Sequence, residues 1–175
     1  RLSFPLEGSV STEMMKREQA LVLMAFPDVG LRSDSAICGD VLNELCSGMS
    51  SRLFERVREE KGLAYYVGST RIVGLEEGMF VLYAGTHAEA VDAVIQEICY
   101  EVSRIVAGAV TDDEFVRCRT RLKAARLMNR QTIGARAMQV GMNLAYNLPL
   151  DKDSEYAKKV DAVDAEVLAK FAATH

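Results

Sequence analysis

The chain has little histidine and cysteine, which are common zinc ligands: only two histidines and four cysteines occur among its 175 residues. A hydrolytic zinc site needs three protein ligands and an open position for water. Neither His87 nor His175 has a second histidine at helical spacing, and both H-E-x-x-H and H-x-x-E-H are missing. The cysteines form no C-x-x-C pair. We therefore expect no metal or other cofactor in this chain, and we interpret His87 as a polar residue in the first turn of a helix.

Further absences exclude other functions. A serine or cysteine nucleophile needs a histidine base, and neither histidine has a matching sequence context. The glycines follow neither the G-x-G-x-x-G nor the P-loop order. The net charge of -4 argues against a phosphate-dominated nucleic-acid binder. No apolar run is long enough to cross a bilayer. From the charge and from these runs together, we expect neither nucleic acid nor a membrane as a partner.

The composition is that of a globular protein, with 49% hydrophobic and 26% charged residues. We expect one domain over residues 1–175, in which residues 1–17 form a weakly patterned lead-in. The chain begins with Arg1 instead of methionine, so the missing signal peptide says little about the parent protein. The cysteines lie in helix-like patterns: Cys38, Cys46, Cys99 and Cys118. Reduced, buried thiols in a cytoplasmic protein are favoured over disulfides, and a periplasmic or organellar location stays open.

The apolar pattern predicts an α+β fold with helices packed on a small, largely antiparallel or mixed sheet. The run Gln19–Phe26 indicates a strand covered on both faces and ended by Pro27. A second strand is expected from Ala64 and a third over Met79–Gly85, joined by a hairpin turn.

Helices are predicted from caps and from helical spacing of apolar residues. Ser33 or Asp34 is expected to cap the first, and apolar spacing from Val91 to Ile105 predicts the clearest amphipathic one. The capping box Thr111-Asp112-Asp113-Glu114 opens a helix to about Arg130. Its basic residues are expected on a solvated face: Arg117, Arg119, Arg121, Lys123, Arg126 and Arg130. Further helices are expected from Ala135 to near Tyr146 and in two short pieces, the last starting near Asp164.

The most informative stretch runs from Gly48 to Ser69 and predicts a helix–strand corner. Ser50 or Ser51 can cap the helix, and Gly62 follows its last turn, where a left-handed residue commonly ends a helix. Arg58 then lies on the last helical turn and Tyr65 near the start of the strand. A cation and a phenol brought together there can hold a peptide backbone.

The corner also has an ordinary structural interpretation. Arg58 could be a solvated charge that pairs with Glu55 or Glu59. Phe54, four residues before Arg58 and on the same side of the helix, could belong to the core. Tyr65 could be a strand tyrosine with its hydroxyl in water. Spacing alone leaves this alternative open.

The corner resembles the second half-domain of the pitrilysin/insulinase-type zinc peptidases, the group of the mitochondrial processing peptidase. Three segments carry the resemblance: Gly48-Met49-Ser50-Ser51-Arg52-Leu53-Phe54, Val57-Arg58-Glu59 and Gly62-Leu63-Ala64-Tyr65. Other matching segments follow in order, including Ala25-Phe26-Pro27, Glu77-Gly78-Met79-Phe80 and Thr111-Asp112-Asp113-Glu114-Phe115. The match covers roughly residue 18 to the C-terminus. One departure is that a single glycine, Gly48, precedes the Met-Ser-Ser run, where many relatives have two or three.

This resemblance implies a bilobed peptidase that encloses an unfolded peptide between two similar halves. The chain is similar to the half without zinc, so zinc is expected in a partner domain or subunit, in a homo- or heterodimer or on the same chain. Arg58 would hold a substrate carbonyl, Tyr65 would donate to the oxyanion in trans, and the aromatic Phe54 would lie beside them. This chain alone is expected to be inactive. The alternative is a structural or assembly subunit on the same fold without proteolytic activity.

Overall fold

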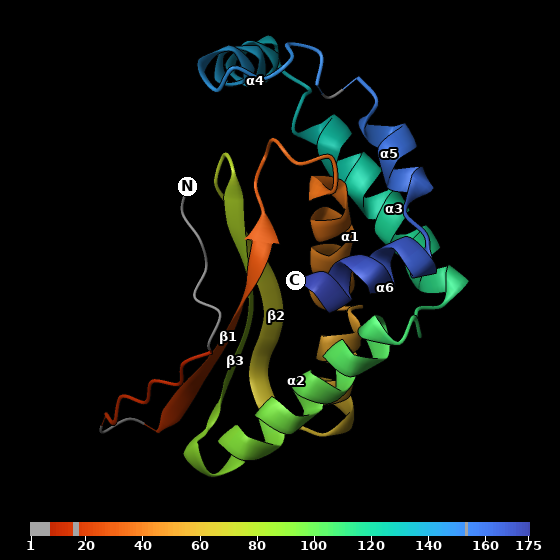
Figure 1. The fold of residues 1–175 in the computed structure, drawn as a ribbon. Coiled ribbons are helices and arrows are strands. Elements are labelled where there is room, and N and C mark those ends of the chain that lie inside the picture. Colours follow the sequence, from red (N-terminus) through yellow and green to blue (C-terminus); the bar gives the residue numbers. More distant parts are fainter. Residues whose placement is uncertain (1–7, 16–17, 153) are drawn as a thin grey trace.

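The computed structural model describes residues 8–15, 18–152 and 154–175. Strands β1 (Gln19–Val29), β2 (Ala64–Val73) and β3 (Glu77–His87) form an antiparallel sheet in the order β1-β3-β2 (Figure 1). Helices cover one face of this sheet, which confirms the predicted α+β class. Residues 8–15 are exposed and have no regular secondary structure. The remainder of the expected lead-in lies outside the described residues.

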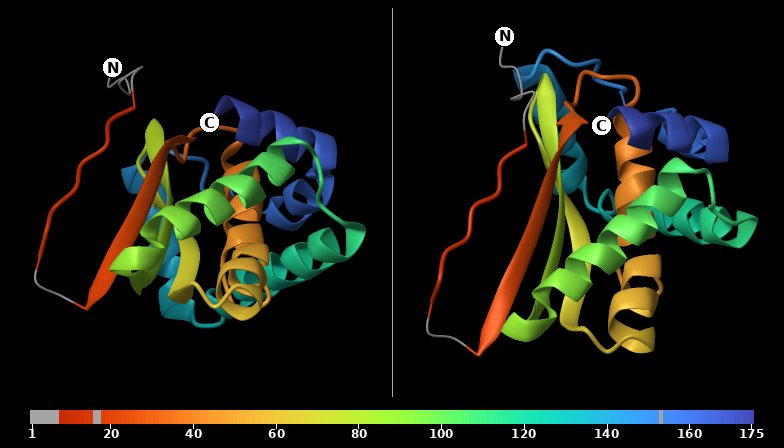
Figure 2. Two further views of the ribbon diagram at one scale, coloured as in Figure 1. Left: turned by 90° about the horizontal axis from the view of Figure 1, so that it is seen from below. Right: turned by 60° about the horizontal axis from the view of Figure 1, so that its bottom comes forward.

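The helices follow the expected order along the chain. Helix α1 (Ala36–Cys46) and the π-helix η1 (Phe54–Glu60) separate β1 from β2. After β3 come η2 (Ala88–Ala90), α2 (Val91–Val106), α3 (Asp112–Met128), α4 (Ile133–Ala145), α5 (Tyr156–Ala162) and α6 (Ala165–Thr174). Helix α4 lies apart from the layer that covers the sheet (Figures 1 and 2). None of the helices in the described ranges is long and apolar enough to cross a membrane.

The core lies between the sheet and the helices. Alternate strand residues such as Val22 and Leu82 point into it, and they meet Val41 of α1, Ile98 of α2 and Leu168 of α6. Each such side chain, once fully buried, contributes about 1.5–3 kcal/mol of transfer free energy. The period-2 pattern of the strands and the helical period of α2 thus face each other across one apolar layer.

The opposite face of the sheet carries half-exposed apolar side chains, among them Leu21 and Leu23 of β1 and Ile72 of β2. The prediction that β1 is covered on both faces is therefore wrong. The strand also continues through Pro27 to Val29, because β1 is at the edge of the sheet and one side of its backbone has no strand partner there.

Three smaller predictions also need correction. Helix α1 starts after Ser35, and the hydroxyl of Ser33 accepts from the Ser35 amide instead of capping the helix. Cys99 is exposed, whereas the other three cysteines are buried, and all four are free thiols. His87 is the last residue of β3 and lies outside the helix expected to contain it.

The corner between η1 and β2 turns at Gly62, which has a φ of 61°. The amide of Gly62 donates to the Arg58 carbonyl at 3.1 Å, and that of Leu63 donates to the Val57 carbonyl at 2.9 Å. No atom lies within 4 Å of the position that a Cβ on Gly62 would take. The glycine is therefore needed for its backbone conformation, as the sequence predicted, and not for space.

We predict that Gly62→Ala lowers the free energy of unfolding by about 1–2 kcal/mol, the cost of a left-handed alanine. The control is Gly141→Ala in α4, where a Cβ also meets nothing within 4 Å. That exchange should raise stability by about 1 kcal/mol, because alanine is the better helix former. Chemical denaturation of both variants checks the opposite signs, and an equal effect of the two would contradict the assignment.

Candidate functional site

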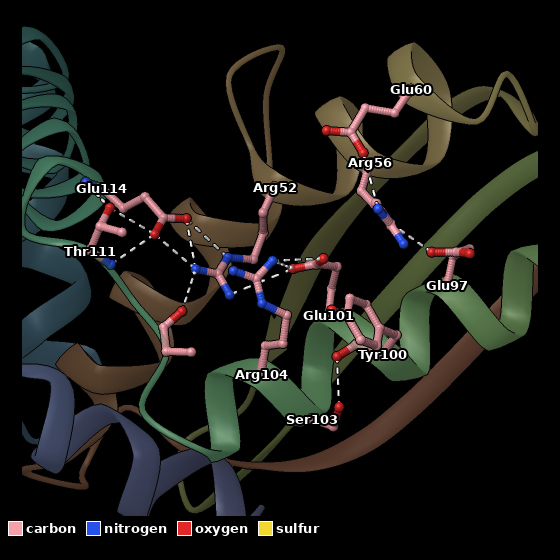
Figure 3. Close-up of polar contacts among 11 residues, drawn as sticks. Arg52, Arg56, Glu60, Glu97, Tyr100, Glu101, Ser103, Arg104, Thr111 and Glu114 are labelled. Atoms are coloured by element: carbon pink, nitrogen blue, oxygen red, sulfur yellow. Dashed lines mark hydrogen bonds and ion pairs between the residues drawn. The ribbon is translucent and has the colours of Figure 1, made fainter.

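The helical run that leads into η1 is fixed by a buried arginine, Arg52, whose side chain is 6% exposed. Its Nε and Nη2 donate to the carboxylate of Glu114 on α3, at 2.7–3.0 Å. Nη2 also donates to the Ala109 carbonyl at 3.0 Å, and Nη1 lies 3.6 Å from Oε2 of Glu101 on α2. Figure 3 shows Arg52 between these two acidic residues. One guanidinium thus joins the start of η1 to both α2 and α3.

Glu114 has two roles in this cluster. Its Oε2 accepts from the Thr111 amide at 2.9 Å while its own amide donates to the Thr111 hydroxyl at 3.3 Å, so the predicted capping box is confirmed. Burial alone would raise the pKa of Glu114, but the Thr111 amide and the Arg52 guanidinium hold it below its ordinary value. The carboxylate of Glu114 therefore stays charged and can form the ion pair with Arg52.

A second arginine on the same segment, Arg56, is much more exposed. It donates to Glu97 at 2.8 Å and to Glu60 at 3.2 Å (Figure 3), and its guanidinium carbon lies 5.3 Å from the centre of the Tyr100 ring. The hydrogen bond from Arg56 lowers the pKa of Glu97. This outer pair is screened by water, in contrast to the pairs of Arg52.

A buried ion pair also fixes β2 to its neighbours. Nε of Arg71 donates to Asp28 of β1 at 2.6 Å, and Nη1 donates to the Ala36 carbonyl of α1 at 3.0 Å. Burial lowers the pKa of Arg71, but hydrogen bonds and attraction from Asp28 and Asp40 raise it overall. Together with Arg52, this arginine fixes both elements of the corner.

The corner itself begins in η1, which is a π-helix and not the ordinary helix expected. The Ser51 hydroxyl accepts from the Phe54 amide at 3.2 Å, as a predicted cap should. Arg58 has a 43% exposed side chain, and its guanidinium carbon lies 4.7 Å from the centre of the half-buried Phe54 ring. Glu59 is 3.7 Å from Arg58, as the ordinary interpretation anticipated, but both groups are open to water.

Tyr65 lies at an irregularity in β2. Ala64 pairs with Thr86 and Tyr66 with Gly85, so Tyr65 is the extra residue of a β-bulge. Bulges re-aim side chains and occur often beside active sites. Tyr65 is 44% exposed, and its hydroxyl contacts both ring nitrogens of His87, at 3.0 Å for Nδ1.

In the structure, the guanidinium of Arg58 thus lies over the Phe54 ring, and the hydroxyl of Tyr65 contacts the His87 ring. Within the described ranges, no hydrogen bond joins Arg58 directly to Tyr65. Sequence reasoning missed Arg52, Arg71 and His87. Arg52 and Arg71 stand at positions of a helix and a strand that otherwise face the core, and this could have indicated buried ion pairs. The contact of His87 with Tyr65 could have been found only from the strand register.

The basic residues in and just after α3 were predicted to be solvated, and this holds for Arg117 and Arg121, which are exposed, but only in part for the half-buried others: Arg119, Lys123, Arg126 and Arg130. Arg121 pairs with Glu44 of α1 at 2.8 Å, and Lys123 pairs with Asp161 of α5 at 2.7 Å. Arg119 donates to the Val163 carbonyl at 2.7 Å. These residues join α3 to the neighbouring helices.

The described residues do not fit a metal ion, because no group of three or more His, Cys, Asp or Glu side chains is suitably placed among them. Burial also raises the pKa of the Cys46 and Cys118 thiols to about 12, so neither is a thiolate near neutral pH. The accessible polar groups at the corner are the guanidinium of Arg58 and the phenol of Tyr65, a cation and a hydrogen-bond donor.

Comparison with known proteins gives consistent matches. The family model described as Peptidase M16 inactive domain matches residues 3–122. An uncharacterized zinc protease of Streptomyces coelicolor is 30% identical over 164 residues, which are 93% of this chain and 36% of that protein. One of Rickettsia felis is 34% identical over 98 residues, 56% of this chain and 24% of its own length. The chain therefore spans well under half of these curated relatives.

A solved structure agrees in fold. The crystal structure of a peptidase M16 inactive domain from Pseudomonas fluorescens superposes with a TM-score of 0.81 at 19% identity. The match covers 92% of this chain and 39% of that one. At this identity the likeness concerns the fold alone.

We predict that Arg52→Met lowers the free energy of unfolding by about 3–5 kcal/mol, because it removes the buried cation of Glu114 and leaves the buried Glu101 with Arg104 alone. The matched control is Arg56→Met, which removes the exposed partner of Glu60 and Glu97 and should lower stability far less, because water screens these pairs. Urea denaturation measures both values, and similar losses would refute the role given to Arg52.

Proposed function

This chain belongs to the M16 peptidase family as an inactive domain, and from that premise we propose that it binds extended peptide for a zinc site on another domain or subunit. Arg58 and Tyr65 are the groups that it supplies. Arg58 holds a carbonyl of the substrate, with Phe54 beside it, and Tyr65 donates a hydrogen bond to the oxyanion that develops at the scissile carbonyl. The accessible hydroxyl of Tyr65, in a bulge next to η1, is the observation that carries the proposal.

The surroundings of Arg58 support a binding role. Its charge is accessible, the carboxylate of Glu59 lies 3.7 Å away in a pair open to water, and the Phe54 ring holds the guanidinium from one side. Such a group loses little when a substrate carbonyl replaces water. The π-helix is a further sign, because π turns often occur at functional sites.

The uncovered face of the sheet suits an extended peptide. It presents apolar side chains, including Leu21, Leu23 and Ile72, and none of the described helices covers it. An unfolded segment could bury its own apolar side chains there without a requirement for one sequence. This supports a preference for extended conformation over a defined cleavage motif.

Zinc would be held outside this chain. The described residues offer no metal cluster, and the relatives named as zinc proteases have most of their length beyond the matched region. The chemistry of the metal, activation of water for attack on the peptide bond, would come from that other part. The residues of this chain would bind the peptide and neutralise the developing charge.

We predict that Tyr65→Phe in the complete peptidase lowers kcat by about 10²–10³-fold and leaves KM nearly unchanged, because the hydroxyl acts mainly in the transition state. Tyr100→Phe is the matched control, since it removes an equally exposed hydroxyl on α2. Its kcat should equal that of the wild type.

The assay uses an unfolded peptide, and zinc content is measured for each variant to exclude loss of the metal. Unchanged turnover in Tyr65→Phe would remove the oxyanion role. A complete protein without zinc and without peptidase activity would favour the structural-subunit alternative.

A further inference from the structure

We propose that His87 is a positioning residue for the Tyr65 hydroxyl, which orients the phenol and leaves its proton free for the substrate. This inference rests on the proposed function and adds a residue to it. The contact is direct: the Tyr65 oxygen lies 3.0 Å from Nδ1 of His87 and also contacts Nε2. The two rings meet edge to face with centroids 4.9 Å apart.

The contact follows from the register of the sheet. Thr86 pairs with Ala64, and its hydroxyl donates to the Leu63 carbonyl at the start of β2. His87 is the next residue, at the end of β3, and the bulge lets the side chain of Tyr65 reach it. Without the extra residue, the strand alternation from Tyr66 onward would place Tyr65 on the other face. The bulge and the strand end therefore create this pair together.

The pair has a defined hydrogen-bonding logic. A phenol is both donor and acceptor, and a neutral imidazole carries one N–H. In the tautomer that carries its proton on the nitrogen facing the hydroxyl, the imidazole N–H donates to the phenol oxygen, whereas in the other tautomer the phenol donates to the ring nitrogen. The proposed role uses the first tautomer. The phenol proton is then directed away from His87 and toward the substrate. In such a chain each hydrogen bond polarises the next, so the phenol becomes a better donor to an oxyanion.

His87 is also free to take this role. Its ring is exposed, and in the described part of the chain no carboxylate pairs with it. A histidine held only by Tyr65 has no other evident structural task. Its substitution should therefore affect turnover more than stability.

The test compares His87→Phe and His87→Gln in the complete peptidase, each with Tyr65 and with Phe at position 65. His87→Phe keeps a ring but loses the N–H, and we expect kcat to fall about three- to tenfold with KM unchanged. His87→Gln retains an N–H donor and should recover most of the activity. On the Tyr65→Phe background, both changes should have no further effect.

The outcomes separate the two proposals. If Tyr65→Phe alone leaves kcat unchanged, the proposed function fails. If Tyr65→Phe lowers kcat but His87→Phe does not, or lowers it equally on both backgrounds, His87 has no role through Tyr65 and this inference fails.

A second measurement does not depend on activity. In the complete peptidase, a long-range ¹H–¹⁵N spectrum identifies the His87 imidazole by its loss in His87→Gln, and His175, whose ring packs on Phe171, is the internal reference. We expect Tyr65→Phe to shift the His87 nitrogen signals and to leave those of His175 in place. Unmoved His87 signals would show that the contact does not form and would overturn the inference.

Discussion

The guanidinium of Arg52 is the interaction on which the candidate site depends. Buried charge is costly unless it is paired, and here one side chain hydrogen-bonds to Glu114 and to the Ala109 carbonyl and forms an ion pair with Glu101, although Nη1 itself has no hydrogen-bond partner among the described residues. Its planar set of donors can satisfy several acceptors from different elements at once, which lysine could not do. Because the acceptors come from α2, α3 and the segment between them, the start of η1 has one position relative to the helical layer.

The rest of the corner follows Arg52 along the chain. The inner side of the helical run is buried at Leu53 and Val57, whereas the side chain of Arg58 is exposed to water. Gly62 then reverses the chain into β2, where the bulge exposes Tyr65. Polar groups for binding are thus presented from rigid elements and not from a long loop, an arrangement that limits the entropy lost when a substrate is bound.

Several features of the fold and of the corner could be predicted from short sequence motifs. The capping box at Thr111 and the left-handed Gly62 each depend on a few adjacent residues, so the sequence showed them correctly. Arg52 was missed because its partners lie far along the chain, and sequence spacing does not show which charges meet. The π-helix has no distinct sequence pattern, and the approach of His87 to Tyr65 depends on strand register and a bulge. Tertiary pairing, more than local propensity, decides the chemistry of the corner.

We propose that Arg58 and Tyr65 act on one peptide bond. A crystal structure of the complete peptidase with a phosphonamidate peptide, whose anionic oxygens imitate the tetrahedral oxyanion, would test this directly. We expect the Tyr65 hydroxyl about 2.7–3.1 Å from one of these oxygens, and the Arg58 guanidinium on a peptide carbonyl. A bound inhibitor with both side chains still in solvent would contradict it.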